Sequence, residues 1–348
     1  MKHFQSVKNY HSTLFLILSV MLLFFFIADI LLGSVKIPFS ELIKIFFSSQ
    51  PVKPEWKIIV FDFRLPKAIA ALVAGIGLSV SGLQMQTIFR NPLAGPYVLG
   101  ISSGASLGVA LLVLALPTFY ISAPFVTGNW AIVMASWIGA GLTLLLILAV
   151  SSKVRDIFTV LILGIMIGSA ISSAVSILQY FGSETLLKSF IVWTFGSLGH
   201  ISRNQLVVFV PCIIVGLLVA FYTAKKLDAL LLGEKYATSM GLHVRNARFV
   251  VFLSTSILAG SVTAFCGPIG FVGIVVPQLC KMVFKTANHK ILISASMLVG
   301  AIALLLSDIV SQIPGYNITL PINSITALLG IPFIIWIIIK HQRLNTLG

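Results

Sequence analysis

Long apolar runs recur along the whole chain and are separated by short polar segments. A helix needs about 20 apolar residues to cross the hydrocarbon core of a bilayer. Runs of this kind lie at 14–33, 66–86, 97–116, 130–150, 157–181, 204–224, 291–313 and 321–339. With 58% hydrophobic and 9% charged residues, the chain is far less charged than a soluble domain. The sequence therefore predicts an all-α polytopic membrane protein, with residues 1–348 forming one transmembrane domain.

A further apolar run, 249–280, is too long for one span and short for two, and Gly267 and Pro268 interrupt it. The segments on either side, 225–248 and 281–290, are rich in Lys and Arg, so the positive-inside rule places both in the cytoplasm. Two crossings must then lie between them. Both chain ends are also basic, which requires an even number of spans. The sequence thus predicts ten transmembrane helices with cytoplasmic N- and C-termini.

The net charge of +14 has the same origin, because the Lys and Arg residues lie between apolar runs. It indicates membrane orientation and contact with lipid, and no nucleic-acid partner is expected. The first apolar run follows Lys2 and Lys8, as in a signal peptide, but it is long and lacks a clean small-x-small cleavage site. We interpret it as an uncleaved first span.

Two short stretches indicate an internal repeat. AGIGLSVSG (74–82) and AGSVTAFCG (259–267) share Ala-Gly followed by Gly, and a proline, Pro92 or Pro277, follows each at the same offset. The predicted topology runs the two stretches in opposite directions, which is typical of the inverted repeats of transporters. Coincidence in a sequence rich in Gly and Ala remains the alternative.

The sequence lacks the motifs of an ATPase and of a zinc metalloprotease. It has no Gly-Lys pair, and so no Walker A loop, and it has no HExxH zinc motif. Asp29 and Asp308 are the main charges inside apolar runs, whereas ion-driven carriers usually need networks of buried carboxylates or histidines. We interpret each Asp as a helix-end carboxylate that reaches the interface or accepts a hydrogen bond, in preference to a substrate site. Energy for transport is expected from another subunit.

Three segments are candidates for function. The stretch FRNPLAGPYVLGISSGASLG (89–108) places prolines and glycines at membrane depth, as a helix seam, a pore element or a protein contact would require. The segment 225–248 predicts short amphipathic helices, punctuated by Gly233 and Gly241, that either dock a soluble partner or lie flat in the interface.

The third candidate is the run 157–181, which carries a polar stripe at helical spacing. The stripe consists of Ser169, Ser172, Ser173, Ser176 and Gln179. It is a candidate lining for a transport path. Hydrogen bonding between helices is an equal alternative.

Several stretches closely resemble FecCD-like permeases, the membrane subunits of binding-protein-dependent ABC importers for iron-siderophores, haem and vitamin B12. These stretches are 63–108, LLGEKYATSMGLHVRNAR (231–248), GPIGFVGIVVPQLCK (267–281), LLLSDIV (304–310) and 320–340. The resemblance implies ten spans and a pair of permeases, formed with a second copy or a paralogue. It also implies a cytoplasmic ABC ATPase dimer, an external substrate-binding protein and a multi-pass location in the bacterial cytoplasmic (inner) membrane.

The resemblance also implies roles for particular residues. It makes 231–241 the segment that docks the ATPase, with Leu232, Gly233, Glu234, Met240 and Gly241 as coupling residues. It places Asn91, Pro92 and Leu93 at an inner gate. The sequence departs from the family at Gln278, where His is usual, at Lys67, where Arg is usual, and at Asn323, where small residues are common.

The function predicted on this basis is the permease subunit of an ATP-driven importer of a metal chelate, which is not itself an enzyme. ATP and Mg²⁺ would bind the partner ATPase, and no cofactor or metal is expected in this chain. A secondary carrier without an ATPase partner is the alternative. A membrane-embedded enzyme fits poorly, because the six histidines are scattered along the sequence.

Overall fold

A computed structural model describes residues 2–33, 35, 37–47, 53–116, 129–154, 156–312 and 319–345. In these ranges the regular structure is helical, apart from an isolated antiparallel bridge between Gln312 and Thr319. Seven helices of the described chain are long and apolar enough to cross a membrane. They run through Tyr10–Leu31, Pro54–Ile88, Trp130–Lys153, Ile157–Phe181, Arg203–Leu231, Val244–Cys266 and His289–Ser311.

Three shorter apolar helices, Ile101–Ala115, Val272–Phe284 and Ile322–Ile337, lie where the sequence predicted the remaining spans. The prediction of an all-α membrane protein is therefore confirmed, while the count of ten crossings stays a prediction. Val272–Phe284 has 13 residues. At about 1.5 Å per residue it is about 20 Å long, short of the roughly 30 Å hydrocarbon core.

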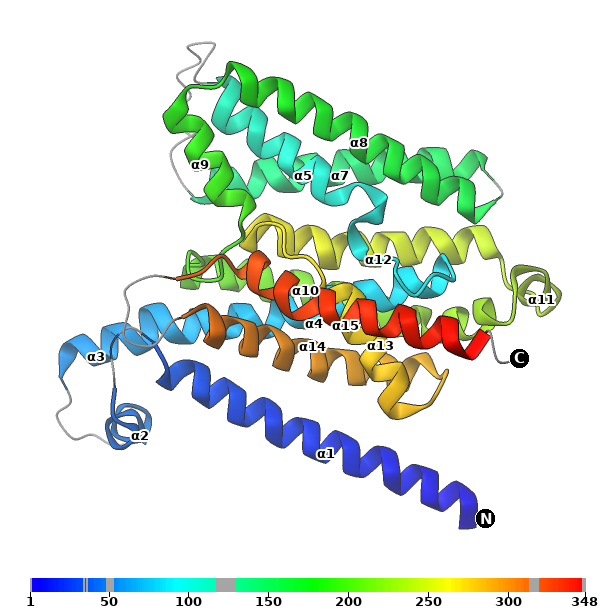
Figure 1. The fold of residues 1–348 in the computed structure, drawn as a ribbon, viewed down its shortest axis with the longest axis horizontal. Coiled ribbons are helices and arrows are strands. Elements are labelled where there is room, and N and C mark those ends of the chain that lie inside the picture. The colour runs from blue at the N-terminus through cyan, green and yellow to red at the C-terminus, as the bar shows by residue number, and fades with distance from the viewer. Residues whose placement is uncertain are drawn as a thin grey trace.

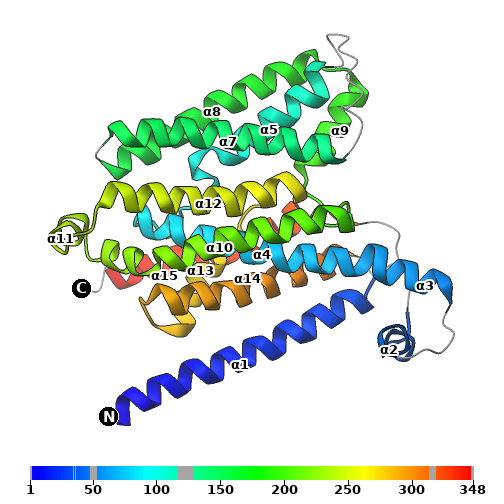
Figure 2. The same cartoon turned by 180° about the vertical axis from the view of Figure 1, so that it is seen from behind.

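Helix α4 (Leu65–Ile88) is the centre of the molecule (Figures 1 and 2). Around it pack α10 (Arg203–Leu231), α12 (Val244–Cys266), α13 (Val272–Phe284) and α14 (His289–Ser311). In the most apolar window of the α4 span 83% of the residues are buried, against 11% in α1 (Lys2–Leu31). Helix α1 packs on α14 at one edge, so most of its surface faces outward.

A second layer covers the opposite side of α12. It contains α5 (Ile101–Ala110) with its continuation η3 (Leu111–Ala115), α7 (Asn129–Lys153), α8 (Ile157–Phe181) and α9 (Glu184–Thr194). Helix α5 contacts α7 and α8, and α7 contacts α12. The last helix, α15 (Ile322–Asn345), packs against α13 and α14.

The described chain ends and the short helix α11 (Glu234–Ser239) lie at one end of the molecule (Figure 1). Helices α2 (Phe39–Phe47), α3 (Pro54–Ile58) and α9 lie at the other end. Helix α3 continues through η1 (Ile59–Arg64) into α4, so one helical stretch leaves the bundle at that end. Termini on the same side agree with an even number of crossings, and their cytoplasmic location stays a prediction.

Side-chain caps begin several of the helices. Asp156 accepts hydrogen bonds from the main-chain nitrogen and the hydroxyl of Thr159 at the start of α8, and these bonds lower the pKa of Asp156. Ser202 and Gln205 form a capping box at the start of α10. Each cap satisfies main-chain N–H groups that the first helical turn leaves unpaired.

Two loops with a positive-φ glycine separate consecutive helices, one after α12 and one after α4. Helix α12 ends at Cys266, and Gly267 follows with φ 74°, which confirms the turn predicted near Gly267 and Pro268. Between α4 and α5 lies a non-helical segment that contains the 3-10 turn η2 (Pro96–Leu99) and Gly100 with φ 70°. Both glycines adopt a conformation that side chains with a Cβ rarely take.

Glycines also bring helices into close contact, as expected for a membrane bundle. A Cβ on Gly82 would lie 1.7 Å from the carbonyl oxygen of Gly273, so α4 and α13 touch backbone to backbone there. Gly75 meets Gly300 of α14 in the same way, at 2.2 Å. These contacts set the short distance between the backbone of α4 and the backbones of α13 and α14.

The stretches proposed as an internal repeat differ in local structure. Gly82 lies inside α4, whereas Gly267 ends α12. Pro92 lies in the loop after α4, whereas Pro277 lies inside α13. Helices α4 and α12 do run in opposite directions (Figure 1). The residue-by-residue match is therefore not mirrored in the local structure, and the repeat stays a prediction.

Asp29 and Asp308 are both buried at the end of the bundle that carries α3. Asp308 forms an ion pair with Lys67 at 2.9 Å and accepts a hydrogen bond of 2.8 Å from the Gln312 amide. The same amide lies 3.4 Å from Asp29. These contacts agree with the interpretation that each carboxylate accepts a hydrogen bond from a neighbour, while reach to the interface stays a prediction. Lys67, a departure from the family pattern, supplies the cation of this pair.

Candidate functional site

The predicted inner gate lies in the loop directly after α4. Arg90 adopts a positive φ of 48°, and the Asn91 carboxamide accepts a hydrogen bond of 2.9 Å from the Leu93 main chain. This Asx-type turn directs Pro92 and Leu93 outward, and Leu93 is 40% exposed. The loop therefore presents two apolar side chains, Pro92 and Leu93, at the end of the molecule where α11 lies.

Helix α13 holds this loop through polar contacts. The Gln278 amide donates to the Pro92 carbonyl oxygen at 3.2 Å and to Gln86 Oε1 at 2.6 Å. Lys281 Nζ donates to the same Gln86 oxygen at 3.1 Å, and Gln86 in turn donates to the Ile274 carbonyl at 2.9 Å. Gln278, the second departure from the family pattern, is thus a gate-loop contact. The Gln278 side-chain amide supplies the hydrogen-bond donor of this contact.

The predicted coupling segment forms one short helix rather than several. Residues 225–231 are the last turns of α10, and α11 follows between two glycines. Gly233 has φ 116° and Gly241 has φ 82°, which explains why glycine stands on both sides of α11. Three large apolar side chains in this segment are more than half exposed, namely Leu232 at 65%, Tyr236 at 57% and Met240 at 62%.

Glu234 has an internal contact in addition to its predicted role. Its carboxylate forms an ion pair with the Arg248 guanidinium near the start of α12. The Arg248 side chain is 7% exposed and that of Glu234 is 39% exposed. The ion pair between Glu234 and Arg248 therefore holds α11 against α12. Leu232, Tyr236 and Met240 are therefore the exposed apolar part of the segment's surface.

The predicted polar stripe lies on α8. Ser169, Ser172, Ser173 and Ser176 are exposed and Gln179 is half-buried. Three of the serine hydroxyls donate to carbonyl oxygens of their own helix, while Ser172 donates to Ser103 of α5 at 3.2 Å. Hydrogen bonding between helices, the alternative made from sequence, therefore accounts for Ser172 and not for the other three serines.

A groove of about 390 Å³ lies where the start of α5 meets α8. It is lined by Tyr97, Val98, Gly100, Ser103, Gly164, Ile165, Gly168, Ser169 and Ser172. The groove runs from the segment that follows the gate loop to two serines of the stripe, Ser169 and Ser172. Ser173, Ser176 and Gln179 do not line it.

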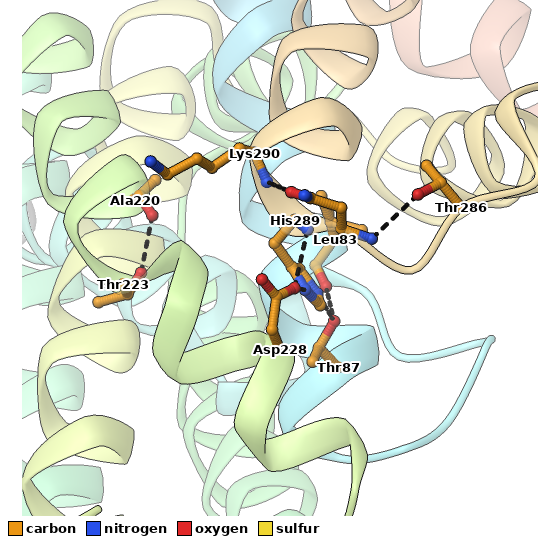
Figure 3. Close-up of polar contacts among 9 residues, drawn as sticks. Leu83, Thr87, Ala220, Thr223, Asp228, Thr286, His289 and Lys290 are labelled. Atoms are coloured by element: carbon orange, nitrogen blue, oxygen red, sulfur yellow. Dashed lines mark hydrogen bonds and ion pairs between the residues drawn. The ribbon is translucent and has the colours of Figure 1, made fainter. Parts of the chain in front are cut away.

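Sequence reasoning missed the residues that join the gate loop to the rest of the inner end. Gln86 and Lys281 are examples, and a cluster of Thr87, Asp228 and the buried His289 is another (Figure 3). The two partners of each of these contacts lie on different helices and far apart in the sequence. No local motif marks them, and only the polarity of Gln86 and Thr87 within an apolar run could have drawn attention to them.

Known proteins are similar to this chain in sequence and in fold. Residues 21–340 match the model of the FecCD transport family. The chain belongs to the FecCD family. This result confirms the resemblance drawn from the sequence, and with it the assignment as a multi-pass membrane permease.

Named relatives of this FecCD chain are also permeases. The Hemin transport system permease protein HmuU of Yersinia pestis is 34% identical over 286 residues, covering 82% of this chain and 84% of the relative. The Vitamin B12 import system permease protein BtuC of Escherichia coli O9:H4 is 32% identical over 294 residues, covering 83% and 86% respectively. A solved structure of a metal-chelate type ABC transporter in an inward-facing conformation matches with a TM-score of 0.81. It is 28% identical in sequence and covers 94% of this FecCD chain and 99% of its own.

Proposed function

We propose that this chain is the membrane permease subunit of an ATP-driven, binding-protein-dependent importer of a metal chelate. Membership of the FecCD family over residues 21–340 carries the proposal. The relatives named for hemin and vitamin B12 and the metal-chelate type neighbour support this cargo class. A ferric siderophore, haem and cobalamin are the candidate cargoes.

The ATPase is proposed to be a separate cytoplasmic dimer that docks on residues 232–241. Exposed apolar side chains on a short helix at one end of the molecule are a typical docking surface for a soluble partner. Leu232 and Met240 are proposed to contact the ATPase. Gly233 and Gly241 would set the path of the chain, and Glu234 would hold α11 on α12. ATP and Mg²⁺ would bind on that partner.

The transport path is proposed to run along the exposed serine face of α8, between this permease and a second copy or a paralogue. The path would be weakly binding, because the serine hydroxyls already donate within the protein. Asn91, Pro92 and Leu93 would close its inner end. An external binding protein would deliver the chelate at the end that carries α2, α3 and α9.

The test is co-purification of the cognate ATPase through this subunit. Leu232→Glu and Met240→Glu add charge to the exposed surface and leave the glycines and the Glu234 contact unchanged. We expect each variant to retain at least tenfold less ATPase than the wild type. Lys188→Ala, an exposed residue of α9 at the other end, is the matched control and should retain the wild-type amount.

If both variants keep the ATPase, the docking assignment is wrong. If the wild type captures no ATPase and yet transports in vesicles under an ion gradient, the chain is a secondary carrier and the proposed function fails.

A further inference from the structure

His289, the first residue of α14, has a completely buried imidazole ring with a partner on each nitrogen (Figure 3). Nδ1 lies 2.6 Å from Asp228 Oδ1 of α10, and Nε2 lies 2.8 Å from Thr87 Oγ1 of α4. The main-chain nitrogen of His289 donates to the same Asp228 oxygen at 2.9 Å. One side chain therefore joins the ends of three helices.

The hydrogen-bond pattern fixes the orientation of the ring. A carboxylate oxygen accepts, so Nδ1 carries the hydrogen, and in the neutral ring Nε2 accepts from the Thr87 hydroxyl. The Leu83 carbonyl oxygen lies 2.9 Å from the same hydroxyl and competes for its one hydrogen. Each ring nitrogen thus has a polar partner within hydrogen-bond distance, as expected of a buried polar group.

The three helix ends lead directly into the proposed machinery. Asp228 lies in the last turn of α10, which continues through Gly233 into α11. Thr87 lies in the last turn of α4, which continues through Arg90 into the gate loop. A second contact runs beside the first, because the Arg90 guanidinium donates to the Leu230 carbonyl at 2.8 Å.

Hydrogen bonds to α13 also hold the end of α4. Gln86 precedes Thr87 in α4 and is held by Gln278 and Lys281 of α13. The last turn of α4 is therefore bonded directly to α13 and α14, and Arg90, which follows this turn, is bonded to α10. Directional bonds on several sides leave this turn little freedom to move without its partners, as a rigid transmitting element requires.

We propose that Asp228, His289 and Thr87 form a link that carries the movement of the coupling segment to the inner gate. The inference rests on the proposed function, since it needs an ATPase on residues 232–241 to move α11. His289 is a positioning residue in this scheme, because it touches neither cargo nor nucleotide. ATPase closure pulls on the end of α10, and His289 passes the displacement to the end of α4.

The test uses the permease assembled with its ATPase and binding protein in proteoliposomes. Thr87→Val keeps the shape of the side chain and removes the hydroxyl that faces His289. Thr223→Val is the matched control, because Thr223 is equally buried and donates to Ala220 of its own helix at 2.8 Å (Figure 3). Thr87→Ser restores the hydroxyl, and His289→Phe removes both ring contacts.

The readouts are cargo imported per ATP hydrolysed and the nucleotide-dependent labelling of a cysteine placed at Leu93. For Thr87→Val and His289→Phe we expect import per ATP to fall at least fivefold and the labelling change at position 93 to disappear. ATPase co-purification and the ATP hydrolysis rate should stay within twofold of the wild type. Thr87→Ser and Thr223→Val should match the wild type in both readouts.

An unchanged ratio in Thr87→Val would overturn the link. A loss of import that follows an equal loss of assembly or melting temperature would also overturn it, because it would show a structural role alone. Failure of the proposed function looks different, since the wild-type permease would then recruit no ATPase at all.

Discussion

At both ends of the bundle, polar residues of this apolar chain are paired with partners far away in the sequence. At one end Lys67 pairs with Asp308, and at the other His289 joins Asp228 to Thr87. In lipid an unpaired buried charge is costly, so such groups are found bonded to one another. At the residue scale, Lys67 supplies the cation of its pair with Asp308, and Gln278 supplies a hydrogen-bond donor to the gate loop.

The Lys67–Asp308 pair gives a prediction about stability. Removing one partner of a buried ion pair leaves an uncompensated charge, which typically costs about 3–5 kcal/mol. Lys67→Met should therefore lower the apparent melting temperature of the detergent-solubilised protein. The double variant Lys67→Met with Asp308→Leu should recover most of the loss, because neither charge remains.

Lys188→Met, at an exposed lysine of α9, serves as the control and should melt like the wild type. A double variant that melts no higher than Lys67→Met would contradict this account of the pair.

At the element scale, glycine contacts decide how the helices pack. Helix α4 touches α13 and α14 through Gly82 and Gly75, where a Cβ would overlap a neighbouring backbone carbonyl. A backbone clash cannot be relieved by a rotamer change, unlike a clash with a flexible side chain. Close glycine contacts of this kind are typical of helix association in membranes.

Gly82→Ala is accordingly predicted to destabilise the bundle. Overpacking of this kind costs about 1–3 kcal/mol, and more where the neighbour cannot move. Gly141→Ala in α7 is the matched control, because a Cβ there meets nothing within 4 Å. It should be neutral or stabilising by up to about 1 kcal/mol, since Ala favours a helix more than Gly. Melting curves of both variants check this, and equal melting temperatures would argue against the α4–α13 contact.

At the scale of the whole molecule, the two ends of the bundle differ in character. One end carries the described termini, α11, the gate loop and the His289 cluster. The other carries α2, α3, α9 and the Lys67–Asp308 pair. This division separates a surface proposed to bind an ATPase from one proposed to receive a binding protein.

The orientation of these ends in the membrane can be tested with a membrane-impermeant maleimide. A cysteine replacing Lys188 of α9 should be labelled in intact cells. A cysteine replacing Tyr236 of α11 should be labelled only after the membrane has been opened. The wild type, whose Cys266 and Cys280 are buried and whose Cys212 is partly buried, provides the background. Labelling of both positions from the same side would contradict the fold, and a reversed pattern would contradict the predicted cytoplasmic termini.

Much of this architecture follows from the sequence by itself. Helices form where about 20 apolar residues run together, because each segment must satisfy its backbone within the bilayer. The break near Gly267 and the interruption of 225–248 at Gly233 and Gly241 were also predicted, and all three glycines have positive φ angles in the structure. The family was identifiable from motifs that keep their order along the chain, and the match over residues 21–340 confirmed it.

Tertiary structure alone decided which polar groups meet. Thr87, Asp228 and His289 lie on three helices, and neither helical period nor motif spacing relates them. The same holds for the Lys67 partner of Asp308, because the sequence predicted a helix-end carboxylate that reaches the interface or accepts a hydrogen bond, without identifying a cation. Sequence patterns report which face of a helix is apolar, whereas the pairing of two polar side chains depends on how helices are placed and rotated against one another. That placement is set by contacts such as Gly82 with Gly273, which exist only once the bundle has formed.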